Sequence, residues 1–158
     1  MNIEIERKFL IDMDNLAAAQ ACIANTTEIE QGYLCYYPAI RVRIINQRTS
    51  QLCIKYKNLA AEGTQEFEYP IPIDDAKLLI QQTNSIIKKR RHSLGLPFPG
   101  LWVLDEFLGK LYGLYIIEVE KIDEPIEQIP TWLGKEVTLD ERYYNVALSA
   151  TQKIPEEY

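Results

Sequence analysis

Apolar and polar residues alternate one by one along most of this chain, which is the side-chain period of a β-strand. Turn-forming sequences such as Tyr37-Pro38, Glu62-Gly63 and Pro99-Gly100 interrupt the alternation. Short connections of this kind favour antiparallel hairpins. The pattern therefore predicts eight strands, over residues of about 2–11, 28–37, 39–46, 51–58, 64–72, 85–94, 100–108 and 114–122.

Short apolar stripes at helical spacing predict three helical regions. Asp12 or Asp14 is placed to cap a helix over residues 15–22, and Asp74 to cap a second through residues 76–80. A third region is expected to begin near Asp140 and to run toward the end of the chain. Because the strands dominate, we expect a mainly β (α+β) fold, with residues 1–158 forming one domain.

Charges of the same sign recur two residues apart, so that both members of each pair lie on one face of a strand. For any single pair an ordinary solvated face is the simpler interpretation. Six such pairs are unusual, since like charges repel and a solvated face normally mixes signs. The pairs are Glu4/Glu6, Arg41/Arg43, Lys55/Lys57, Glu66/Glu68, Lys89/Arg91 and Glu118/Glu120.

Eight antiparallel strands can close into a barrel that encloses side chains or one small ligand. The charged pairs would then line the lumen, and their apolar neighbours would face outward under helices or a partner. The expected outward residues are Ile3, Ile5, Val42, Ile44, Ile54, Phe67, Ile117 and Val119.

Composition narrows the class of protein. With 158 residues, of which 47% are hydrophobic, the chain can bury one core, and no Gly/Ser-rich or Pro-rich stretch divides it. A formal net charge of -6 argues against a general nucleic-acid binder, although Lys88-Lys89-Arg90-Arg91 could hold a compact anion. Charge from Glu4 onward and the lack of a long apolar run predict a cytoplasmic protein without a membrane partner.

Cysteine and histidine usage excludes other kinds of site. The three cysteines, Cys22, Cys35 and Cys53, have unrelated spacings, which favours reduced thiols over disulfides or a zinc site. His92 is the sole histidine, and nothing in the sequence points to a Ser-His-Asp arrangement around it.

The clustered carboxylates indicate a hard-metal site. Without compensating cations they would repel strongly, and oxygen ligands without imidazole or thiolate favour Mg²⁺ or Mn²⁺ over zinc. Cross-strand pairs with arginine and lysine are the alternative role for the same side chains. The candidate metal ligands are Glu4, Glu6, Glu66, Glu68, Asp105, Glu118 and Glu120.

The paired cations indicate an anionic partner. Guanidinium groups match phosphate oxygens two at a time, and carboxylates, cations and a divalent ion together suit a metal–polyphosphate complex. The candidate phosphate ligands are Arg41, Arg43, Lys55, Lys57, Lys89 and Arg91, with Lys89/Arg91 favoured over the alternative inward pair Lys88/Arg90.

Taken together, these motifs resemble the CYTH superfamily, also called triphosphate tunnel metalloenzymes, through nearly the whole chain. The small bacterial members are similar in further motifs as well. These are Gln31-Gly32-Tyr33-Leu34, Trp102-x-x-Asp105-x-Phe107 and Gly134-x-Glu136-Val137-Thr138, whereas Glu4-x-Glu6-x-Lys8 at the N-terminus resembles the superfamily as a whole.

The resemblance implies an eight-stranded antiparallel closed barrel whose tunnel binds triphosphate and one divalent ion. It further implies hydrolysis of tripolyphosphate to pyrophosphate and phosphate, with nucleoside triphosphates as further substrates. A Lys–Tyr dyad is proposed to activate water in such members, and Lys8 with Tyr33 fits by motif position; Lys8 would also contact substrate. The family often has a glycine after the first lysine of this motif, and this chain lacks one after Lys55, so Lys57 matches the family pattern less well than Lys55 does.

Two other functions remain open from the sequence. An adenylyl cyclase of the same superfamily would use a similar tunnel, and a polyphosphate- or nucleotide-binding module would keep the charged lumen without turnover. Monomer and homodimer also both remain open.

Overall fold

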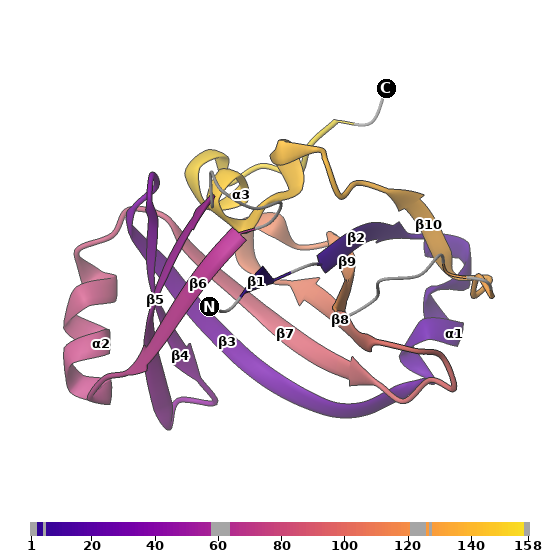
Figure 1. Cartoon of the computed structure of the whole chain (residues 1–158), viewed down its shortest axis with the longest axis horizontal. Coiled ribbons are helices and arrows are strands. Elements are labelled where there is room, and N and C mark those ends of the chain that lie inside the picture. Colours follow the sequence, from indigo (N-terminus) through magenta and orange to yellow (C-terminus); the bar gives the residue numbers. More distant parts are fainter. Residues whose placement is uncertain (1–2, 5, 58–63, 121–125, 127, 157–158) are drawn as a thin grey trace.

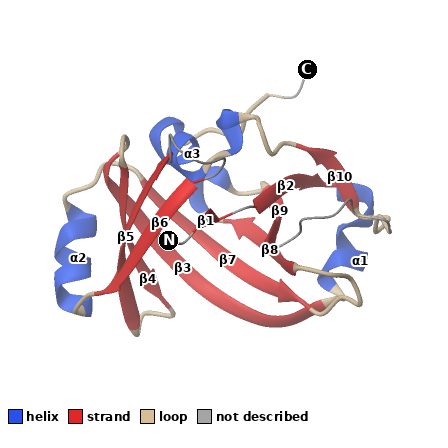
Figure 2. Cartoon of the chain, viewed as in Figure 1, coloured by secondary structure: helices blue, strands red, loops and turns tan. Residues whose placement is uncertain are grey.

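The computed structural model describes residues 3–4, 6–57, 64–120, 126 and 128–156. Ten antiparallel strand segments form one sheet in the order β1-β6-β5-β4-β3-β7-β8-β9-β2-β10 (Figures 1 and 2). Their bounds are β1 Ile3–Glu4, β2 Glu6–Ile11, β3 Ile23–Cys35, β4 Ala39–Ile45, β5 Thr49–Lys57, β6 Thr64–Pro70, β7 Ile86–Leu94, β8 Leu101–Phe107, β9 Tyr115–Glu120 and β10 Leu133–Glu136.

The mainly β class is confirmed, whereas closure of the sheet is not shown by the described residues. β1 pairs with β6, and β2 pairs with β9. β1 and β2 lie on either side of residue 5, which is outside the described residues. A sheet that begins at β1 and ends at β10 is the observed arrangement.

The observed strands differ from the predicted ones in the start of β3 and in the presence of β10. β3 begins at Ile23, five residues before the predicted start, because its first part pairs with β7 although its sequence does not alternate. β10 was absent from the prediction because its four residues are too few to show a period. It pairs with β2, and a Cβ atom at Gly134 would lie 2.8 Å from the carbonyl oxygen of Leu10, so this close approach requires glycine.

Three α-helices are described: α1 Leu16–Gln20, α2 Ile73–Gln81 and α3 Asn145–Thr151. Asp12 caps a 3-10 turn before α1 by accepting from the backbone N–H of Asp14, rather than capping α1 itself. The predicted cap at Asp74 was wrong, because α2 begins at Ile73 after Pro72 and places Asp74 inside its first turn. Asp140 caps a 3-10 turn over Glu141–Tyr143, which precedes α3. No helix among the described residues is long and apolar enough to cross a membrane.

The helices cover different parts of the sheet. α2 packs on the outward side chains of Val42 and Ile44, and Ile117 and Val119 are buried in a second cluster with Trp102. Phe67, also expected to face outward, remains 37% exposed. The side chains of Ile3 and Ile5 lie outside the described residues.

α3 lies against the face of the sheet that carries the charges. Its Leu148 joins a buried cluster with Phe107 and Ile116. By strand alternation Phe107 shares a face with Asp105, and Ile116 shares a face with Glu118. The charged face therefore ends in an apolar cluster beneath α3, and this packing fixes α3 beside the charged residues.

Candidate functional site

The register between β2 and β9 brings three carboxylates and a lysine together. Glu6 lies opposite Glu120, and Lys8 lies opposite Glu118. Lys8 Nζ is 2.8 Å from Glu6 Oε1 and 2.9 Å from Glu118 Oε1. One carboxylate oxygen from each of Glu6, Glu118 and Glu120 lies within 4.8 Å of the others.

β7 and β8 contribute a buried ion-pair network. Lys89 Nζ donates to Asp105 Oδ2 at 2.6 Å, and neither side chain is exposed. Arg91 donates to both oxygens of Asp105 at 2.8 and 2.7 Å and to Glu118 Oε2 at 2.8 Å. Arg91 thereby connects this network to the three carboxylates. Lys88 and Arg90 are exposed, so the inward pair on β7 is Lys89 and Arg91.

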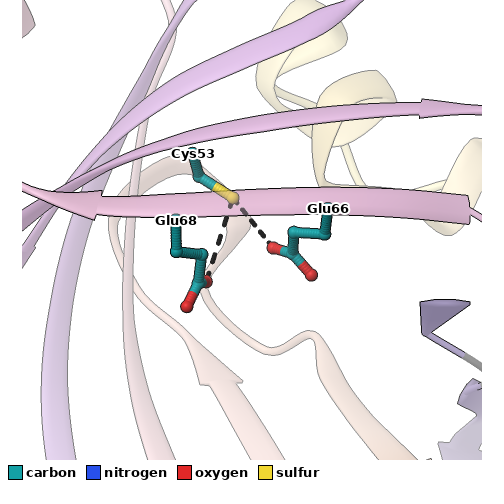
Figure 3. Close-up of side chains that lie close together, drawn as sticks. All are labelled: Cys53, Glu66 and Glu68. Atoms are coloured by element: carbon teal, nitrogen blue, oxygen red, sulfur yellow. Dashed lines mark hydrogen bonds between the residues drawn. The ribbon is translucent and has the colours of Figure 1, made fainter. Parts of the chain in front are cut away.

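Glu66 and Glu68 of β6 form a second acidic group beside Cys53 of β5 (Figure 3). Arg41 Nη2 lies 3.1 Å from Glu66 Oε1, and Cys53 Sγ donates to the same oxygen at 2.8 Å. Glu68 lies farther from both, at 3.9 Å from each. Glu66 and Glu68 therefore share an arginine and a buried thiol rather than joining the carboxylates of β2 and β9.

β3 places two polar side chains beside the arginines of β4. Gln31 is opposite Arg43 and accepts from its Nε at 3.0 Å, while Tyr33 is opposite Arg41. Two fully buried donors, Gln31 Nε2 and Arg41 Nε, have no hydrogen-bond partner among the described residues. Such donors are costly unless a ligand or water supplies an acceptor.

A cavity of about 970 Å³ opens next to these groups. Its wall carries four of the predicted cationic side chains, one carboxylate and the predicted tyrosine. Other wall residues come from the segment after β3 and from the start of α3, including Tyr36, Tyr37 and Asn145. The predicted residues on the wall are Glu6, Lys8, Tyr33, Arg41, Lys55 and Lys57.

The electrostatics of the β2–β9 group favour its charged forms. Burial lowers the pKa of Lys8, but Glu118 and Glu6 outweigh burial, so that this pKa is raised above its ordinary value. Burial likewise opposes ionisation of Glu118, yet Lys8 and Arg91 hold the pKa of Glu118 well below its usual range. The lysine is therefore a fixed cation and the glutamate a fixed anion at neutral pH.

Crowding of cations has the opposite effect elsewhere. Burial, with the neighbouring Arg41 and Arg91, lowers the pKa of Arg43 to about 10. Burial also lowers the pKa of Lys89, although Asp105 acts against it. Buried cations that lie near other cations gain from an additional anion.

The predicted site residues divide into groups. Glu6, Glu118 and Glu120 lie together, whereas Glu66 and Glu68 form a separate group and Asp105 is paired with Lys89 and Arg91. The side chain of Glu4 is outside the described residues. Arg43, Lys89 and Arg91 are absent from the wall of this cavity; Arg43 and Lys89 are buried, whereas the side chain of Arg91 is 22% exposed.

The donor set of Glu6, Glu118 and Glu120 fits a hard divalent cation. All three donors are carboxylate oxygens, they converge within 4.8 Å, and Glu6 also reaches the cavity wall. The second group offers a thiol in place of a third carboxylate, so it is less suited to Mg²⁺ or Mn²⁺.

Sequence reasoning missed several polar residues of the site. Gln31 was visible in the Gln-Gly-Tyr-Leu motif, and Cys53 lies two residues before Lys55 on the same face of β5. No sequence motif pointed to Asn145, because only the packing of α3 brings this residue to the cavity.

Comparison with known proteins gives consistent matches over nearly the whole chain. A model of the CYTH domain matches residues 2–154. An inorganic triphosphatase of Acetivibrio thermocellus is 34% identical over 151 residues, with 92% of each chain covered. An inorganic triphosphatase of Nitrosomonas europaea is 35% identical over 154 residues, covering 92% of this chain and 96% of the relative. The crystal structure of the inorganic triphosphatase NE1496 superposes with a TM-score of 0.67 at 31% identity, covering 99% of both chains.

Proposed function

This chain belongs to the CYTH family, and we propose that it is an inorganic triphosphatase that hydrolyses tripolyphosphate to pyrophosphate and phosphate. The observation that carries the proposal is the cavity. Cations and a carboxylate line one wall of it, and buried donors without acceptors lie beside them. A triphosphate would supply the missing acceptors and neutralise the crowded cations.

CYTH enzymes are metal-dependent, and we assign the metal to Glu6, Glu118 and Glu120, with Glu4 as a further ligand. Mg²⁺ or Mn²⁺ suits three carboxylates better than a softer ion does. When bound, the ion would neutralise phosphoryl oxygens and polarise phosphorus. Lys8 and Arg91 already hold Glu118 in place for this task.

We assign phosphate binding to the four cations on the cavity wall, which are Lys8, Arg41, Lys55 and Lys57. Arg41 has a buried Nε without an acceptor, so it is well placed to donate to a phosphate oxygen. The positive charges of Arg43 and Arg91, which act electrostatically on each other and on Arg41, add to this field.

Water activation is assigned to Tyr33, assisted by the fixed positive charge of Lys8. Both side chains lie on the same cavity wall, and Tyr33 neighbours Arg41 across the β3–β4 pair. The phenol oxygen of Tyr33 would orient the water and take up its proton as the water oxygen attacks the terminal phosphorus. The bond from that phosphorus to the bridging oxygen breaks, and pyrophosphate leaves with the electron pair.

The sheet would close into the barrel expected from the sequence if β1 and β2 formed one continuous strand. That strand would pair with β6 at its start and with β9 along the rest, which would join both sides of the sheet. Closure would place both acidic groups around one lumen.

One assay tests the function. Purified protein with Mg²⁺ or Mn²⁺ is incubated separately with tripolyphosphate and ATP, and phosphate, pyrophosphate, ADP and cyclic AMP are resolved. Release of equal amounts of phosphate and pyrophosphate from tripolyphosphate is expected. Cyclic AMP from ATP without tripolyphosphate turnover would identify an adenylyl cyclase, whereas tight triphosphate binding without any product would identify a binding module.

A further inference from the structure

We propose that Asn145 binds the substrate, its side-chain amide donating a hydrogen bond to a phosphate oxygen while the buried Lys89 holds that amide in position. This inference rests on the proposed function, because it takes the ligand of the cavity to be a triphosphate. It gives Lys89 a positioning role behind the cavity wall in place of the direct phosphate contact expected from the sequence.

The contact between the two residues is direct. Lys89 Nζ donates to Asn145 Oδ1 at 3.1 Å and to Asp105 Oδ2 at 2.6 Å. Lys89 is only 1% exposed, and its ammonium lies 5.4 Å from the centre of the Phe107 ring. The lysine is therefore enclosed on the protein side of Asn145 and is out of reach of the cavity.

The chemistry of the contact fixes the orientation of the amide. An ammonium has three donors and no acceptor, so the atom of Asn145 that faces it must be the oxygen. The nitrogen, Nδ2, then points the other way, and Asn145 is one of the residues that line the cavity. No described residue accepts a hydrogen bond from Nδ2. The two N–H donors of this amide are thus left for a ligand of the cavity.

The backbone of Asn145 is held rigidly enough for this role. Ser149 Oγ donates to the carbonyl oxygen of Ser85 at 2.6 Å, and Gln152 Nε2 donates to that of Ile86 at 3.3 Å. Leu148, directly before the first of these anchors, is fully buried. These contacts attach α3 to the start of β7, the strand that carries Lys89, so the amide and the ammonium belong to one packed unit.

A donor of this kind suits a triphosphate. The amide oxygen accepts from a cation, which polarises the amide and strengthens its N–H groups as donors. The wall around Asn145 also carries Lys8 and Arg41, so an anion held by these cations comes within reach of the same side of the cavity. A neutral donor adds a directed contact without adding to the repulsion among the buried cations.

The alternative role is purely structural, with Asn145 serving only as a link between α3 and Lys89. Asn145→Asp separates the two roles. It keeps an oxygen for Lys89, and so preserves the link, but it removes both N–H donors and turns a negative charge toward the substrate. Asn145→Ala removes both the link and the donors, and Thr151→Ala, at the exposed far end of α3, is the matched control.

The experiment measures binding of an imido-bridged triphosphate analogue by calorimetry in Mg²⁺, together with kcat and KM for tripolyphosphate and the melting temperature of each variant. We expect Asn145→Ala to weaken analogue binding by about tenfold or more, and Asn145→Asp to weaken it further while melting at or above the wild-type temperature. The control should bind like wild type.

The outcomes that overturn the inference are distinct from failure of the proposed function. If wild type hydrolyses tripolyphosphate but both Asn145 variants bind the analogue within twofold of wild type, Asn145 is not a ligand. If Asn145→Ala loses binding and Asn145→Asp retains it, the residue is only a structural link. If wild type neither binds the analogue nor hydrolyses tripolyphosphate, the proposed function and this inference fall together.

Discussion

Tyr33 and Lys8 illustrate how much a side chain in this protein depends on its neighbours. A phenol is a poor base by itself, and a lysine in an apolar interior tends to lose its proton. Here the carboxylates of Glu6 and Glu118 keep Lys8 charged, and Tyr33 lies beside Arg41 on the same cavity wall. Each residue acquires its proposed role from partners on other strands.

At this scale the first prediction concerns Tyr33→Phe, which removes one hydroxyl group and leaves the ring. If Tyr33 orients or deprotonates water, turnover of tripolyphosphate should fall by about 10²–10⁴, the usual scale for a positioned base. Affinity for the imido-bridged analogue should change little. Tyr36→Phe, at a second tyrosine of the cavity wall, is the matched control and should retain most activity. Near-normal turnover by Tyr33→Phe would exclude the tyrosine as the base.

At the scale of elements, β10 shows how a short strand is positioned by its contacts. It pairs with β2, where Gly134 approaches the backbone of Leu10 closely, and Glu136 accepts two hydrogen bonds from Arg7 at 2.9 and 2.8 Å. The next residues, Val137 and Thr138, bond to the backbone of Lys8. β10 therefore supports the strand that carries Glu6 and Lys8.

The second prediction tests this close approach. Gly134→Ala should lower the free energy of unfolding by about 1–3 kcal/mol, because its Cβ atom would meet backbone rather than a flexible side chain. Gly95→Ala is the matched control, since a Cβ atom there would find ordinary contacts, the nearest at 3.7 Å. Urea denaturation of both variants measures the difference. Equal stability of the two variants would show that β10 can shift without cost.

The third prediction is the pH dependence of the Arg7–Glu136 pair. Hydrogen bonding to Arg7 lowers the pKa of Glu136 below its ordinary value of 4.5. The pair therefore stabilises the fold above pH 4.5, and this contribution disappears as the pH falls through the lowered pKa. Since Glu136 is substantially exposed, Glu136→Gln should cost less than about 1 kcal/mol at pH 7.

The measurement compares unfolding of wild type and Glu136→Gln at pH 7 and again well below pH 4.5. The difference between the two proteins should shrink toward zero in acid. Glu156→Gln, at an exposed glutamate near the end of the chain, should show no such trend. A difference that grows in acid would contradict the sign of the linkage.

At the scale of the whole molecule, the chain has a net charge of -6 and yet is proposed to bind a highly charged anion. The arrangement of charge resolves this conflict. Four cations face the cavity, while the carboxylates of Glu6, Glu118 and Glu120 are gathered at one place where a divalent ion can offset them. Binding of triphosphate and of metal should therefore depend on each other.

The fourth prediction follows from that coupling. EDTA should abolish tripolyphosphate hydrolysis, and Glu120→Gln should raise the metal concentration that gives half-maximal activity, because it weakens one ligand of the proposed site. Glu68→Gln, in the group that already holds Arg41 and Cys53, is the comparison and should shift the metal requirement less. Full activity in EDTA would rule out a catalytic metal.

The sequence by itself determined the mainly β class, most of the strands and the alternation of charged and apolar faces. The reason is that the two-residue period of a strand can be recognised from the order of neighbouring residues. It also selected Lys89 and Arg91 as the inward residues of β7, and the structure agrees. These features depend on local order along the chain, which needs no knowledge of which strands are neighbours.

Only the tertiary structure decided which charges meet. The registers of β2 with β9 and of β5 with β6 place Glu118 beside Lys8 but leave Glu66 and Glu68 around Cys53. Packing of α3 brings Asn145 onto the cavity wall in front of Lys89. Two of these contacts, Lys8 with Glu118 and Lys89 with Asn145, join residues more than fifty positions apart. All of them depend on strand order and helix packing, which the period of a sequence does not encode.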